Sequence, residues 1–150
     1  MSGEQDYYAP QEIRLSAQHW RILQTEAERL APQEACGLLW GTYQAGCFDV
    51  AEVRSIDNVL QSPTRYRMNP AQQIQVFLEM EERHLQLVGI YHSHPQGPEY
   101  PSETDILEAY YPQAVYIILS PGYRAWQARG FLIQEKQVSK VNIEVDSEQC

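Results

Sequence analysis

The chain has 150 residues, of which 43% are hydrophobic and 21% are charged, and its formal net charge at pH 7 is −9. This length and composition predict one globular domain with a single buried core. An acidic chain without a cluster of Lys and Arg is not expected to bind nucleic acid or an anionic membrane surface. No apolar run approaches the length of about 18 residues that a transmembrane helix needs.

Both ends of the chain are predicted to lie outside the folded domain. Residues 1–11 are polar and acidic, unlike a secretory signal peptide, and we expect them to form a flexible leader. The domain is placed at residues 12–145, and residues 146–150 are expected to be a flexible tail. The three cysteines include no Cys-x-x-Cys pair, which indicates free thiols in a reducing compartment and predicts a cytoplasmic protein.

The first half of the domain is predicted to contain a short strand, a helix and a pair of strands. Residues 12–15 favour a strand, and Ser16 is a typical N-cap for a helix that runs to about residue 30. This helix has one apolar face at helical spacing, formed by Trp20, Leu23, Ala27 and Leu30. Beyond Pro32, residues 36–41 and 47–54 predict two strands joined by a turn.

Three further elements lead up to the middle of the chain. Residues 64–68 alternate in polarity as a short strand does. Asn69 and Pro70 predict the start of a helix that runs to about residue 84. Its inward-facing residues are expected to be Ile74, Phe77 and Leu78. Residues 87–91 are apolar enough for a buried strand.

The last third of the chain predicts one short helix and the remaining strands. The helix begins at Ser102 and ends before Pro112. Residues 114–119 have the highest β propensity in the chain and are expected to form a central strand. Residues 124–131 and 132–145 predict the last strands. The order of the elements indicates an α/β fold, on the borderline with α+β, in which a mixed sheet is flanked by helices.

The chemistry of the chain is concentrated in residues 89–105, GIYHSHPQGPEYPSETD. Alternate residues of an extended segment share a face, so His92 and His94 point the same way where the buried strand emerges into a loop. Together with Asp105 they would give a metal three protein ligands and leave a fourth position open, as in a catalytic zinc site. The same ligand types also suit non-haem iron. Ser102 and Asp105 alternatively form a capping box, which is compatible with metal binding.

The spacing His-x-His-x7-Ser-x2-Asp resembles that of the JAMM (MPN-plus) metalloproteases. His92, His94, Ser102 and Asp105 match this spacing without a gap, and the upstream Glu of the family falls on Glu34, within PQEACGLL. The context of Glu34 is similar to that in the small bacterial members of the family. The resemblance covers most of the chain and implies a single-domain MPN fold.

The resemblance also implies a role for each matched residue. His92, His94 and Asp105 would bind one Zn²⁺ per chain, and zinc lowers the pKa of a bound water to about 7. Glu34 would take the proton of that water and pass it to the leaving amine. Ser102 would donate a hydrogen bond to the oxyanion of the tetrahedral intermediate.

The resemblance implies a protein tail as the substrate. Members of the family hydrolyse the peptide or isopeptide bond after the C-terminal Gly-Gly of ubiquitin-like proteins. Only eight residues separate Asp105 from the strand that starts at Ala114, which leaves no room for the insertion with which eukaryotic members grip ubiquitin chains. The short form resembles bacterial members that process sulfur-carrier proteins, including the release of cysteine from the carrier during cysteine biosynthesis.

Two other functions remain open from the sequence. One is a catalytically inactive MPN-type interaction module, and the other is a zinc hydrolase of small peptides or amides. Self-association into a homodimer is also left open.

Overall fold

The computed structural model describes residues 9–145 and folds them into a barrel of seven strands with three helices packed outside it. The strands are β1 (Glu12–Leu15), β2 (Cys36–Gln44), β3 (Cys47–Ile56), β4 (Gln86–Ser93), β5 (Val115–Pro121), β6 (Trp126–Gln134) and β7 (Gln137–Val145). The helices are α1 (Ala17–Leu30), α2 (Pro70–Glu82) and α3 (Glu103–Leu107). The α/β class and most of the predicted elements are therefore confirmed, including β5, which is paired on both sides.

The sheet is mixed, as predicted, and it closes on itself. The strands follow the order β1–β3–β2–β4–β5–β6–β7, and β7 pairs with β1. The β4–β5 pair is parallel, as are both pairs that β1 makes. Closure depends on one four-residue strand, in which Glu12 pairs with Cys47 on one side and with Asn142 on the other. The sequence does not predict closure, because these partners are distant in the chain.

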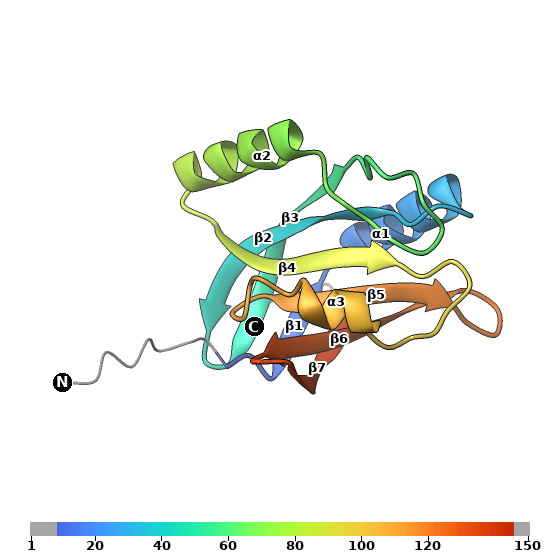
Figure 1. Cartoon of the computed structure of the whole chain (residues 1–150). Helices are drawn as coiled ribbons and strands as arrows, with labels where there is room; N and C mark the ends of the chain where they lie inside the picture. The colour runs from blue at the N-terminus through green and yellow to red at the C-terminus, as the bar shows by residue number, and fades with distance from the viewer. Residues whose placement is uncertain (1–8, 146–150) are drawn as a thin grey trace.

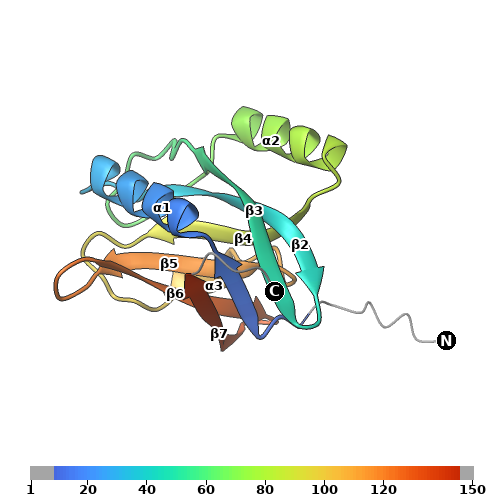
Figure 2. The same ribbon diagram turned by 180° about the vertical axis from the view of Figure 1, so that it is seen from behind.

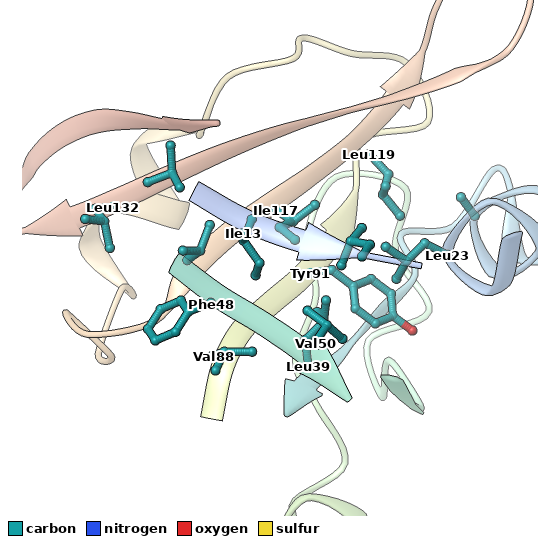
Figure 3. Close-up of a cluster of buried hydrophobic side chains, with 14 residues drawn as sticks. Ile13, Leu23, Leu39, Phe48, Val50, Val88, Tyr91, Ile117, Leu119 and Leu132 are labelled. Atoms are coloured by element: carbon teal, nitrogen blue, oxygen red, sulfur yellow. The ribbon is translucent and has the colours of Figure 1, made fainter. Parts of the chain in front are cut away.

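The barrel interior holds the first of two hydrophobic cores. Figure 3 shows side chains such as Ile13, Phe48 and Ile117 converging from different strands, with Leu23 of α1 among them. Figure 2, the view from behind, shows α1 lying across the near side of the barrel. Leu23 and Ala27 are buried, and Trp20 is partly buried against the same core, so the predicted apolar face of this helix is confirmed.

The second core lies on the outer side of β2, β4, β5 and β6, beneath α2 and α3 (Figure 1). Val76 and Met80 are the buried residues of α2, and Phe77 packs edge-on against Trp40. The prediction that Ile74 and Leu78 face inward is wrong, since they are 62% and 59% exposed. Five apolar residues fall within residues 74–80, and this run is too wide for one helix face to bury completely.

Two further predictions differ from the structure. Residues 64–68 do not form a strand, and only an isolated bridge joins Asn58 to Met68. Cys36 is a free, buried cysteine as expected, whereas Cys47 is disulfide-bonded, which contradicts the expectation of free thiols for that residue. No helix within residues 9–145 is both long and apolar enough to cross a bilayer.

The predicted leader and tail fall mainly outside the described residues. The tail at 146–150 and residues 1–8 of the leader are not described. At the end of the leader, the Gln11 N–H donates a hydrogen bond to the Gly46 carbonyl over 2.8 Å, in the turn between β2 and β3.

Candidate active site

The two histidines of the motif are fixed by strand pairing at the end of β4. His92 is the penultimate residue of β4 and lies between Cys36 of β2 and Ile118 of β5. Just beyond the strand, the His94 N–H donates to the Leu119 carbonyl of β5 over 2.8 Å. The two side chains share a face, as the alternation predicts, and their Nε2 atoms are 3.0 Å apart.

Asp105 reaches the histidines from the first turn of α3. Its Oδ2 atom lies 3.1 Å from the Nε2 atom of His92 and 3.1 Å from that of His94. The same oxygen accepts a hydrogen bond from the Ser102 N–H, and the Asp105 N–H donates to the Ser102 hydroxyl. The capping box therefore forms, and it holds the carboxylate against the imidazoles. The two interpretations of this sequence are compatible in the structure.

The three donor atoms fit a small cation. Ligand atoms bound about 2.0–2.1 Å from a tetrahedral zinc lie about 3.3 Å from one another, close to the separations seen here. The Nδ1 atom of His94 is 2.7 Å from the Pro98 carbonyl, so it carries the hydrogen and leaves Nε2 with a lone pair. Lone pairs of two imidazoles and a carboxylate oxygen that converge on one point repel one another unless a positive charge lies between them.

Glu34 joins this group through the register of β2 and β4. Cys36 pairs with His92, and the Ser93 N–H donates to the Ala35 carbonyl, so the next step brings Glu34 beside His94. Ligand atoms of Glu34, His92 and His94 all lie within 4.8 Å of one another. Glu34 is only 3% exposed, so its carboxyl group is enclosed by the protein.

The environment of Glu34 is unusual for a carboxylate. Its Oε1 atom is buried and has no hydrogen-bond partner among residues 9–145. The pKa of Glu34 is raised to about 8, because burial, together with the charge of Asp105, raises it by more than His94 lowers it. A carboxyl group with a pKa near neutrality can both accept and donate a proton at physiological pH.

The protein charges around the donor atoms also favour a cation. Burial works to raise the pKa of Asp105, but its contacts with the His92 and His94 rings and the hydrogen bond from the Ser102 N–H hold it well below its usual range. Burial lowers the pKa of the fully enclosed His92. Burial also works to lower the pKa of His94, but Asp105 and the Pro98 carbonyl outweigh it and raise the pKa. The site therefore attracts positive charge beside an ionised carboxylate.

Either carboxylate could complete a three-ligand set with the histidines. Asp105 Oδ2 lies at hydrogen-bond distance from both rings, and its backbone and that of Ser102 orient it. Glu34 belongs to the wider group, and its Oε1 atom is not held by any described residue. The shorter contacts favour Asp105 as the ligand, which leaves Glu34 beside the site as a candidate proton carrier.

Two residues that the sequence did not single out also shape the site. The ring of Tyr66 stacks on His92 with a centroid distance of 4.5 Å and an interplanar angle of 24°. Tyr66 also lines an adjacent cavity of about 310 Å³ together with Tyr110, Tyr111 and Tyr116. Asn58 donates a hydrogen bond to the Glu34 carbonyl. Both residues precede α2 in an irregular segment, where no periodicity could indicate what their side chains contact.

Comparisons with known proteins find one family model and several similar prokaryotic proteins. The model of the family of prokaryotic homologs of the JAB domain matches residues 16–129. The chain is 32% identical to a desampylase of Pyrococcus furiosus over 115 residues, which is 75% of this chain and 76% of that protein. It is 38% identical to a CysO-cysteine peptidase of Mycobacterium bovis over 94 residues, or 63% of each chain. A solution structure of a Desulfitobacterium hafniense protein superposes with a TM-score of 0.82 at 30% identity, covering 91% of this chain and 94% of that one.

Proposed function

The chain belongs to the family of prokaryotic homologs of the JAB domain, which makes it a JAMM-type hydrolase, and from this premise we propose that it is a zinc-dependent peptidase or isopeptidase. The proposed reaction is hydrolysis of the bond after the C-terminal Gly-Gly of a ubiquitin-like or sulfur-carrier protein. One observation carries the proposal. Two imidazole nitrogens and a carboxylate oxygen converge within 3.0–3.1 Å of one another, beside a buried carboxyl group with an unpartnered oxygen.

The zinc ligands in this proposal are His92, His94 and Asp105. Zinc supplies Lewis acidity when bound, which lowers the pKa of water to about 7 and polarises a carbonyl group. The hydrogen bond between His94 Nδ1 and the Pro98 carbonyl supports this set, because it orients the ring and directs the lone pair of Nε2 toward the other donors. Iron would accept the same ligands, and metal analysis distinguishes the two.

Glu34 is the proposed general base and acid. Its burial beside His94 keeps it close to the reacting atoms, and its raised pKa of about 8 suits a group that takes a proton from water and returns it to the leaving amine. No other described carboxyl group combines these two features. Glu34 holds and moves a proton in this scheme and does not bind the metal.

Ser102 is the proposed hydrogen-bond donor to the oxyanion. Its oxygen accepts the hydrogen bond from the Asp105 N–H over 3.0 Å, which fixes the side chain and leaves its own hydrogen for a substrate atom. A donor held in place before the reaction stabilises developing negative charge without reorganisation. The capping geometry therefore supports the catalytic role and does not compete with it.

The burial of the site supports a tail without side chains as the substrate. His92 is 1% exposed and His94 is 6% exposed, with Tyr66 stacked on the first and the Pro98 carbonyl against the second. A Gly-Gly tail has the thinnest chain that a protein can offer to such a narrow approach. The similarity to a CysO-cysteine peptidase supports a carrier protein that ends in Gly-Gly-Cys, from which cysteine would be released.

The proposal is tested by measuring metal content and cleavage on the same samples. Wild type, Glu34→Gln and Glu28→Gln are purified without chelator and analysed for zinc and iron. Each is then incubated with a sulfur-carrier protein extended by one cysteine after Gly-Gly, and free cysteine is measured by mass spectrometry. Glu28 is an exposed residue of α1 and serves as the matched control.

We expect about one zinc per chain in all three proteins, as a site with three protein ligands predicts. Cleavage should be abolished in Glu34→Gln and unchanged in Glu28→Gln. Full activity in Glu34→Gln would overturn the assigned role of this residue. A wild-type protein that takes up no metal even when zinc is supplied would overturn the proposed enzyme.

A further inference from the structure

The register of β2 and β4 brings Glu34 beside His94, and an irregular segment outside the barrel holds both of its backbone groups. Glu34 lies two residues before β2, outside the strand ladder. Its N–H donates to the Ser62 carbonyl over 2.8 Å, and its carbonyl accepts a hydrogen bond from Asn58 Nδ2 over 3.0 Å. Both backbone groups of the proposed base are therefore bonded to residues between β3 and α2.

Asn58 is the centre of this segment. Its side chain is buried and makes hydrogen bonds on both sides of the amide. Nδ2 donates to the carbonyls of Glu34 and Arg65, each over 3.0 Å. Oδ1 accepts from the N–H groups of Leu60 and Arg67 over 3.1 and 3.0 Å. A buried amide with all its partners satisfied is well ordered and rigidifies the groups around it.

The same side chain also holds the backbone around Tyr66, the residue that stacks on His92. Arg65 and Arg67, which Asn58 holds by one carbonyl and one N–H, are the two neighbours of Tyr66 in the chain. The Tyr66 ring stacks on His92. One amide group therefore fixes the backbone on both sides of Tyr66 and also the backbone of Glu34.

We propose that Asn58 is a positioning residue that sets the placement of Glu34 and Tyr66 relative to the metal donors. This inference rests on the proposed function, because it concerns the base of that reaction. The metal donors themselves lie on β4, its following loop and α3, and Asn58 makes no hydrogen bond with them. Loss of Asn58 should therefore reduce turnover and leave the metal in place.

Two substitutions separate the parts of this role. Asn58→Ala removes all four hydrogen bonds. Asn58→Asp keeps an acceptor for the Leu60 and Arg67 N–H groups but removes both donors, and it places a carboxylate oxygen opposite the Glu34 carbonyl. Ser62→Ala is the control, because it removes the Ser62 hydroxyl, which contacts only Thr64 among the described residues, and keeps the carbonyl that Glu34 uses.

For both Asn58 variants we expect kcat to fall about 100-fold, the effect of displacing a reacting group by about 1 Å. KM should change by less than about threefold, because the binding surface is retained. Zinc content should stay at about one per chain. Ser62→Ala should have the kcat of wild type. A merely structural role would instead lower zinc content, or reduce the active fraction equally in all assays.

Hydrogen exchange gives a second measurement that does not depend on activity. In both Asn58 variants, the amides of Glu34 and Arg67 should exchange at least about tenfold faster than in wild type, while those of β4 keep their protection. Wild-type kcat in Asn58→Asp and Asn58→Ala would overturn the inference, as would loss of zinc together with turnover. If wild type itself fails to cleave the carrier substrate, the proposed function fails, and the exchange of the Glu34 amide still decides whether Asn58 positions this residue.

Discussion

The two halves of the candidate site are built in different ways. The metal donors lie on β4, on the residue just after it and on the first turn of α3, where strand pairing and a capping box fix the backbone. Glu34 and Tyr66 lie on irregular segments before β2 and between β3 and α2, where an amide side chain replaces the strand ladder. We call these the metal half and the proton-transfer half.

The difference shows that one fold can hold the metal half of a site firmly and let the proton-transfer half change its placement locally. Strand pairs in a closed barrel open only when much of the domain unfolds, so the backbones of His92 and His94 keep their spacing. Irregular segments held by single side chains can change their placement locally, and their sequence can vary without disturbing the barrel. Substitutions should therefore divide into those that remove the metal and those that remove turnover alone.

The largest expected effect comes from breaking the metal half. His94→Ala removes one of three ligands and the contact with the Pro98 carbonyl, so zinc content and cleavage should both fall to background. The measurement is elemental analysis combined with the cleavage assay. His84→Ala is the matched control, since His84 is exposed just after α2. This variant should retain both its zinc and its cleavage activity. A zinc-replete, active His94→Ala protein would contradict the ligand assignment.

A smaller effect should follow from two serines that share one structural role. Ser102 and Ser16 are both N-caps with a capping box, at the starts of α3 and α1. Ser102→Ala should lower kcat about 10²–10³-fold through loss of a hydrogen-bond donor to the oxyanion. Ser16→Ala should lower the free energy of unfolding by about 1 kcal/mol and leave kcat unchanged. Chemical denaturation and steady-state kinetics on both variants compare the two, and equal kcat values would leave Ser102 with a capping role alone.

The sequence predicted the metal half better than the proton-transfer half, for a physical reason. The alternation of His92 and His94, and the capping box that joins Ser102 to Asp105, are local patterns that the backbone geometry preserves. The proximity of Glu34 depends on the pairing of Cys36 with His92, which no local pattern contains. Only the resemblance to a known family indicated it.

Two local predictions failed where side chains override periodicity. Residues 64–68 alternate like a strand, yet the Arg65 carbonyl and the Arg67 N–H bond to the Asn58 side chain in place of a neighbouring strand. In α2, Phe77 packs inward against Trp40 as predicted, but the buried residues beside it are Val76 and Met80 and not Ile74 and Leu78. Tertiary contacts decide the structure of such segments, and local sequence patterns do not reveal those contacts.

The smallest expected effects on zinc content and turnover concern α2. This helix follows the proton-transfer half in the chain, and the N–H of its N-cap Asn69 donates a hydrogen bond to the Asp57 carbonyl. Met80→Ala should lower the free energy of unfolding by about 2–5 kcal/mol, because Met80 is fully buried in the outer core. Leu78→Ala, two residues away on the exposed side, should change it by less than about 0.5 kcal/mol. Because neither residue is a metal donor, folded Met80→Ala should keep its zinc. Any loss of turnover in this variant would come from a shift of the segment between β3 and α2. If Leu78→Ala destabilises as much as Met80→Ala, the inward face of this helix is the one that the sequence predicted.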